Sequence, residues 1–142
     1  GMSIVQNAID LQTEALSADP ENEAIAQQIS MLYVVEGEAY FRNDDAESAL
    51  KSFKTSITFN PDNHTAQYNC GVILVEQFNQ AGKSLNEMTD LDDATYNSMN
   101  EERYTTYLKP ALAFLMVAQN IDPENTEYST MANNIQSLLG DR

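Results

Sequence analysis

Few side chains in this sequence have the types and spacing that catalysis needs. Cys70 and the single histidine, His64, would supply a thiol nucleophile and an imidazole base. On one helix, residues six positions apart point in different directions. His64 falls at the predicted start of that helix, and Cys70 falls on a packing face that favours a small apolar side chain. We therefore expect that the chain is not an enzyme.

A second group of oxygen-bearing side chains resembles a calcium-binding loop. Four residues match the first, third, ninth and twelfth places of an EF-hand: Asp90, Asp92, Ser98 and Glu101. The pattern fails at Ala94, where a ligand is required, and at Thr95, where the turn requires glycine. A helix that starts with Asp93 as its N-cap explains the same residues. We therefore expect neither a metal nor a cofactor.

One carboxylate falls on an otherwise apolar helical face. Glu36 shares a row with four large side chains: Ile29, Leu32, Tyr33 and Tyr40. A buried carboxylate would need a partner or a raised pKa, and Lys51 or Lys54 on the following helix could be that partner. The simpler interpretation is an edge position that a lengthened helix leaves in water.

The charge balance narrows the classes of partner. The 142 residues include 22 acidic and 7 basic side chains, which gives a net charge of −15. This charge repels phosphate backbones and anionic lipids, so we expect no nucleic acid and no membrane partner, whereas a basic protein would be attracted. The alternative is that the charge serves solubility alone. If Met2 is the native start and Gly1 a tag remnant, the absence of a signal segment predicts a cytoplasmic protein.

Three similar strings divide the chain into helical stretches: Asp19-Pro20-Glu21-Asn22, Asn60-Pro61-Asp62-Asn63 and Asp122-Pro123-Glu124-Asn125. Proline cannot continue the helix before it, but it suits the first turn of the next helix, as does an acidic residue. Recurrence of the string indicates repeat boundaries. The expected helices lie near 4–18, 21–42, 45–59, 62–84, 94–119 (bent at Pro110) and 124–139.

Between these boundaries the sequence resembles the tetratricopeptide repeat (TPR), whose pattern is W-x2-L-G-x2-Y, A-x3-F and P. One unit matches through Tyr33, Glu36, Gly37, Tyr40, Ala49, Phe53 and Pro61, and the next through Gln67, Cys70, Gly71, Leu74, Ala111, Leu115 and Pro123. The resemblance implies an all-α fold of antiparallel helix hairpins in a right-handed solenoid of about six helices. A glycine inside a helix costs about 1 kcal/mol relative to alanine, which indicates close helix packing. We expect Ala49 and Ala111 opposite the two glycines.

We expect one TPR-like domain over residues 2–142. It would hold a half repeat at 4–20, a repeat at 21–61 with an extended first helix, and a repeat at 62–123. The last of these would carry an insertion at about 77–109, and a capping helix at 124–139 would close the stack. The half repeat matches the second helix of a pair through Ala8, Ala15, Leu16 and Pro20, so its first helix is missing from this sequence. Either the domain starts there or an upstream segment was removed.

The resemblance also implies a binding face, because the first helix of each TPR pair lines a concave groove. The corresponding residues are Met31, Val34, Glu38, Phe41, Arg42, Thr65, Tyr68, Val72, Val75 and Glu76. Arg42 is the only cation among them, so a clamp for a C-terminal carboxylate is not expected. Apolar groups rimmed by Glu38 and Glu76 suit an extended or helical peptide that carries Lys or Arg. The alternative for the three valines is burial by neighbouring helices.

We therefore predict a non-catalytic adaptor or scaffold that binds a protein or peptide segment, a basic one by preference. Three alternatives remain. The protein could be a chaperone for a secreted or assembly partner. It could bind a ligand or metal, or act as an enzyme, through the insertion. It could also form a dimer through exposed end faces, because repeats bury their apolar faces only through neighbours.

Overall fold

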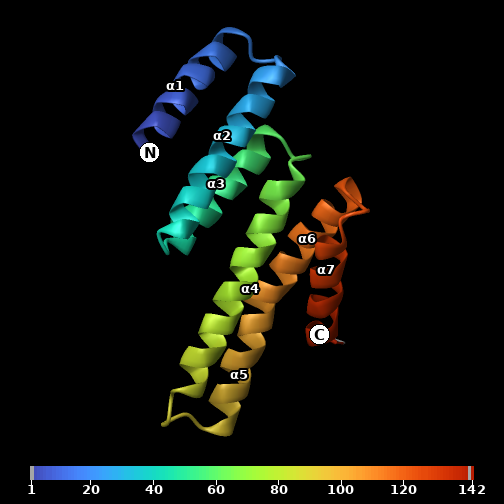
Figure 1. Cartoon of the computed structure of the whole chain (residues 1–142). Coiled ribbons are helices and arrows are strands. Elements are labelled where there is room, and N and C mark those ends of the chain that lie inside the picture. The colour runs from blue at the N-terminus through green and yellow to red at the C-terminus, as the bar shows by residue number, and fades with distance from the viewer. Residues whose placement is uncertain (1, 141) are drawn as a thin grey trace. The chain divides into compact units, whose positions relative to one another are not determined.

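The computed structural model describes residues 2–140 and 142, and that part of the chain is almost entirely helical, with no strand (Figure 1). The first four helices are α1 (Met2–Ala18), α2 (Glu23–Arg42), α3 (Ala46–Phe59) and α4 (His64–Asn86). A continuous helical run follows, made of α5 (Asp93–Arg103), the π-helix η1 (Tyr104–Leu108) and α6 (Lys109–Ile121). The last helix is α7 (Thr126–Leu139). The predicted all-α class is confirmed, with six helical runs in the expected order.

The contacts between residues divide the chain into two compact units. One unit ends at Asn69 and the other begins at Cys70, so the division falls within α4. The first unit holds α1, α2, α3 and the start of α4. The second holds the rest of α4 with α5, η1, α6 and α7. The expected single domain over 2–142 remains a prediction.

All three proline strings form the same turn, which an asparagine ends by capping the next helix. In each turn the backbone N–H of the fourth residue donates to the carbonyl of the first, at 3.0–3.1 Å: Asn22 to Asp19, Asn63 to Asn60 and Asn125 to Asp122. The same asparagine side chains accept from the N–H groups of Ile25, Ala66 and Glu127. Proline fits the second place of such a turn. The helices therefore begin at 23, 64 and 126, two residues later than predicted, because the acidic residue belongs to the turn.

In the first unit, α2 and α3 form an antiparallel hairpin in which Gly37 of α2 lies against Phe53 of α3. A Cβ atom at this position would lie 2.7 Å from the ring of Phe53, which is itself buried. The second unit repeats the relation, since a Cβ on Gly71 would lie 2.7 Å from Cγ of Leu115. Ala49 and Ala111, which were expected opposite the glycines, are both fully buried, and the side chain one turn after each alanine covers the glycine. The placement of the two alanines directly opposite the glycines remains a prediction.

A buried polar cluster fixes α2, α3 and the start of α4 to one another. The Ser30 hydroxyl donates to the Ser56 carbonyl at 2.9 Å, and the Ser56 hydroxyl donates to the Ser30 carbonyl at 2.7 Å. The side-chain amide of Asn63 donates to the Ser30 hydroxyl at 3.0 Å. Because each buried group has a partner, the cluster carries no desolvation penalty from unpaired groups and holds the turn before α4 in place.

The second unit contains the irregularity expected at Pro110, and the structure locates it one turn earlier. The Lys109 N–H donates to the Tyr104 carbonyl, which is the i to i−5 bond of a π-helix. Proline lacks an N–H group, and its ring displaces the carbonyl four residues before it, so a widened turn accommodates it. The expected capping helix is present as α7, which packs on α6 and buries Tyr128, Ala132, Ile135 and Leu139.

Candidate functional site

The first unit carries an apolar pocket of about 620 Å³. It is lined by residues from α1 (Ala8, Leu11, Gln12), from α2 (Gln28, Met31, Leu32, Val34, Val35) and from the start of α4 with its cap (Asn63, Thr65). The polar cluster described above positions its rim, because Asn63 is bonded to both α2 and α4. These bonds hold the start of α4 against α2 at the edge of the pocket.

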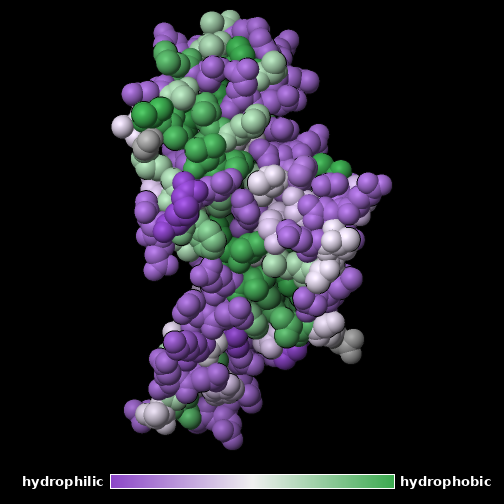
Figure 2. Space-filling model, viewed as in Figure 1, coloured by the Kyte–Doolittle hydropathy of each residue, from purple (hydrophilic) through white to green (hydrophobic). Residues whose placement is uncertain are grey.

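Large apolar side chains stand exposed around this pocket. The exposed fractions are 67% for Leu11, 64% for Met31 and 46% for Val35, and Ile4 farther along α1 reaches 71%. Figure 2 shows hydrophobic side chains gathered over α1 and α2. Residues 4, 8 and 11 share one face of α1, and residues 28, 31 and 35 share one face of α2. The two stripes make an apolar surface of the kind that marks interaction sites.

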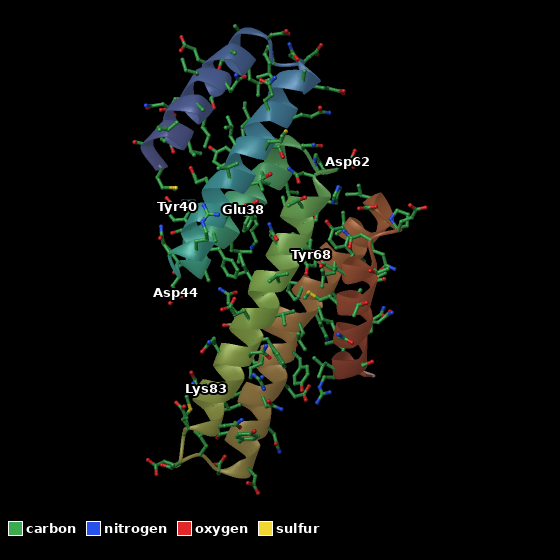
Figure 3. All side chains as sticks on the ribbon, in the orientation of Figure 1. Glu38, Tyr40, Asp44, Asp62, Tyr68 and Lys83 are labelled. Atoms are coloured by element: carbon green, nitrogen blue, oxygen red, sulfur yellow. The ribbon has the colours of Figure 1, made fainter. Side chains whose placement is uncertain are left out.

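The structure brings together three of the ten residues predicted to line a groove. Met31, Val34 and Thr65 share the pocket. Three others, Glu38, Phe41 and Arg42, are exposed near the C-terminal end of α2 and do not line it, and Figure 3 labels Glu38 and Tyr40 in this region. Tyr68 is half-buried on α4.

The remaining predicted groove residues belong to the second unit's part of α4. Val72 and Val75 are half-buried and Glu76 is exposed. The sequence left open that the three valines are buried by neighbouring helices instead of lining a groove. Val34 is buried, with 8% exposed, whereas Val72 and Val75 are only half-buried. The groove as a continuous stripe remains a prediction.

Sequence reasoning missed the contribution of α1 to the pocket. Ala8 was assigned only to the repeat pattern, and Leu11 and Val35 were not considered as binding residues. The available signal was the spacing of Ile4, Ala8 and Leu11 at four and three residues, which places them on one helical face.

The segment that forms α1 and nearly all of α2 carries charge of one sign. From Met2 to Phe41 the sequence has no Lys, Arg or His, and it has seven carboxylates: Asp10, Glu14, Asp19, Glu21, Glu23, Glu36 and Glu38. Burial raises the pKa of Tyr33 above its usual range, and the carboxylates of Glu36 and Asp10 raise it further. The three cations of the first unit, Arg42, Lys51 and Lys54, come later in the sequence.

Glu36 has a different environment from the one predicted. Its side chain is buried, with 8% exposed, and the hydroxyl of Ser52 donates to its Oε1 atom at 2.8 Å. The expectation of a wet edge position was therefore wrong, because α3 covers this face of α2. Lys51 and Lys54 are exposed on α3 instead, where they line a shallow surface with Glu47. Glu36 is thus a packed, hydrogen-bonded group of the hairpin.

The second unit has a smaller cleft of about 330 Å³ between α4 and the run formed by α5 and η1. Arg103 anchors its wall: the guanidinium carbon lies 4.0 Å from the centre of the Phe78 ring. Its Nη2 donates to the Phe78 carbonyl at 3.0 Å, and its Nη1 donates to Asn100 at 2.6 Å. Gly82 leaves the space that the guanidinium fills, since a side chain there would overlap it. Arg103 therefore connects α5 to α4 through these contacts.

The residues considered for catalysis and calcium binding do not assemble into a site. His64 is the first residue of α4, and Cys70 is fully buried on the same helix. Asp92, not Asp93, caps α5, because its carboxylate accepts from the Thr95 N–H at 2.7 Å. In the described part of the chain, no group of three or more His, Cys, Asp or Glu could hold a metal ion. No helix there is long and apolar enough to cross a membrane.

The chain is similar in structure to a TPR repeats protein from Bacteroides fragilis, with a TM-score of 0.76 and 21% sequence identity. The alignment covers 96% of this chain and 62% of that one, so this chain spans less than two thirds of that protein's length. The likeness confirms the TPR-like fold that the sequence pattern predicts. No family model and no curated protein matches the sequence.

Proposed function

We propose that the protein is a non-catalytic adaptor whose first unit binds a segment of another protein. The observation that supports this proposal is the apolar pocket of about 620 Å³, with Leu11 and Met31 about two-thirds exposed at its edge. Contiguous exposed apolar surface on an otherwise charged protein marks interaction sites. The TPR-like fold agrees with such a role, since it generally serves binding and not catalysis, although that support is by analogy of fold.

The first test compares two methionine substitutions. Met31→Asp places a negative charge at the pocket. Met116→Asp, the control, places the same charge on another exposed methionine, which lies on α6 in the second unit. Met116 is 48% exposed, so both variants should fold, which circular dichroism would verify. Each bead-bound variant is incubated with extract of the native cells, and retained proteins are quantified. For proteins that the wild type and Met116→Asp both retain, we expect the retained amount to be about tenfold lower with Met31→Asp. Identical sets with both variants would rule out the pocket.

A chaperone for a secreted or assembly partner is the alternative role. The apolar surface continues beyond the pocket to Ile4, which is 71% exposed, and such a surface suits a partner held unfolded. Hydrogen exchange of a captured partner separates the two roles. An adaptor leaves the partner's amides protected outside the bound segment, whereas a chaperone leaves them exchanging throughout.

A further inference from the structure

We propose that the pocket of the first unit binds one amphipathic helix with basic edges, supplied by a partner protein, and that this helix lies along the exposed apolar face of α1. The proposal rests on the proposed function and specifies the chemistry of the segment that the pocket binds. Three properties of the described residues support it: the uncovered face of α1, the polar groups available in the pocket, and the sign of the charge around it.

The first property is the poor burial of α1. This helix has 17 residues, all of them described, and only Ile9 is buried. By contrast α3, with 14 residues, buries Ala49, Ser52, Phe53 and Ser56. A short helix in water is marginal unless an apolar face is packed. The stripe of Ile4, Ala8 and Leu11 is the face that a further helix would cover.

The length of the two stripes sets the length of the occupant. Residues 4 to 11 on α1 and residues 28 to 35 on α2 each span seven residue steps, which is about 10 Å of helix, or two turns. A helix laid along them would present apolar residues at i, i+3 or i+4, and i+7, which is the usual pattern of a helix bound in a groove. A segment of about 14 residues provides these anchors with one further turn at each end.

The polar groups of the lining favour a helix over an extended strand. An extended peptide needs partners for the backbone N–H and C=O groups that it buries, whereas a helix pairs its own. Only Gln12, Gln28, Asn63 and Thr65 offer polar side chains to the pocket. The amide of Asn63 is already used twice, since its oxygen caps α4 and its nitrogen donates to Ser30. Few partners remain for a buried strand.

The charge around the pocket favours a basic partner over a second copy of this chain. Residues 2–41 carry seven carboxylates and no basic side chain, so two copies facing each other here would bring like charges together. Lys and Arg at the edges of an entering helix would instead meet Glu14 of α1 and Glu38 of α2. These long side chains can also cover the apolar stripe with their methylene groups.

The test is a selection from an unbiased library of random peptides of about 14 residues, displayed on phage. The target is the whole wild-type protein, and binding to Met31→Asp is used for counter-selection. We expect the recovered peptides to carry apolar residues at i, i+3 or i+4, and i+7 and to be enriched in Lys and Arg. Leu11→Asp on α1 should weaken them about as much as Met31→Asp, and Met116→Asp should leave them unchanged. Recovery of no peptide above background would overturn the proposal.

A proline substitution then separates a bound helix from a bound strand. Proline at the centre of the best peptide should weaken binding roughly tenfold or more in fluorescence anisotropy, because it breaks a helix. Equal binding of the proline peptide, or apolar residues at every second position, would overturn the helix. If Met31→Asp still releases cellular partners in that case, the adaptor function stands without it. Light scattering would reveal a dimer of this chain. If Met31→Asp dissociates that dimer, the occupant of the pocket is a second copy, and the proposal is overturned.

Discussion

At the scale of single residues, the two units use the same device to bring helices together. Gly37 lies under Phe53 in the first unit, and Gly71 lies under Leu115 in the second. In both cases the covering side chain stands at the second place of the A-x3-F pattern or its equivalent. The recurrence indicates that the glycine and the large side chain that covers it act as one packing unit.

This arrangement predicts that Gly37→Ala destabilises the protein although alanine is the better helix former. Helix propensity favours alanine by about 1 kcal/mol. Overlap of the new Cβ with a buried aromatic ring opposes it by about 1–3 kcal/mol, because Phe53 has no free space to move into. Urea denaturation should therefore show a lower free energy of unfolding. Gly71→Ala should behave alike, and a gain in stability for either variant would show that the covering side chain yields without cost.

The Phe53→Leu substitution provides the internal control for this prediction. Alone it removes buried apolar volume and should be destabilising. Combined with Gly37→Ala it also removes the overlap, so the double variant should be more stable than the sum of the single effects predicts. Strict additivity would mean that the ring and the new Cβ do not interact.

At the scale of the elements, sequence patterns predicted the number and order of helices well and their first residues less well. The hydrophobic periodicity and the proline strings were sufficient for the order, since they record local preferences. The starts were misplaced by two residues at Glu23, His64 and Thr126 because proline suits both a turn and a first helical turn. The hydrogen bond that the following asparagine side chain accepts decides between a turn and a first helical turn, and this bond is visible only in the structure. The π-helical turn before Pro110 depends likewise on how the whole run packs.

The N-terminus of α5 provides a prediction on pH. The N–H and hydroxyl of Thr95 donate to Asp92 and hold the pKa of this carboxyl below its usual range. Because the folded-state pKa is lower than that of the unfolded chain, the cap stabilises the fold above about pH 4 and its contribution is lost as pH falls below that value. Asp92→Asn keeps the acceptor and does not titrate. The wild type should therefore lose stability relative to Asp92→Asn on acidification.

Proton exchange of the amides at the start of α5 gives the local readout. We expect the N–H of Thr95 to lose protection as the pH falls below about 4 in the wild type and to keep it in Asp92→Asn. A parallel loss in both proteins would show that acid acts elsewhere in the chain. Titration of the Asp92 carboxyl by NMR would check the direction of the shift independently.

At the scale of the whole molecule, the binding surface was only partly predictable. The repeat pattern assigns a stripe to the first helix of each pair, and it thus identified Met31 and Val34. It assigns no binding residue to α1, and therefore Leu11 was missed. Burial of Glu36 was also beyond the pattern, because the hydroxyl of Ser52 that accommodates it lies on another helix. The spacing of residues along one helix predicts which face is apolar, but it does not predict which other helix packs against that face.

The net charge of −15 gives the last prediction, which concerns salt. Folding brings the 22 carboxylates closer together than they are in the unfolded chain, and this self-repulsion lowers stability. Raising sodium chloride from about 0.01 M to about 1 M shortens the screening length from about 30 Å to about 3 Å. The urea midpoint should therefore rise with salt. Chloride is the suitable anion, because sulfate also strengthens apolar burial.

Attractive pairs should not reverse this effect. An exposed ion pair joins Arg142 and Glu101 at 3.1 Å, and both side chains are at least a third exposed. Exposed pairs contribute about 0–1 kcal/mol, and salt weakens them. Asp10→Asn with Glu14→Gln on α1 removes two negative charges, so this variant should gain stability at low salt and approach the wild type at high salt. A midpoint that falls with chloride would show that attraction outweighs repulsion, and the acidic surface would then be neutralised within the fold, with less charge left to attract a basic helix.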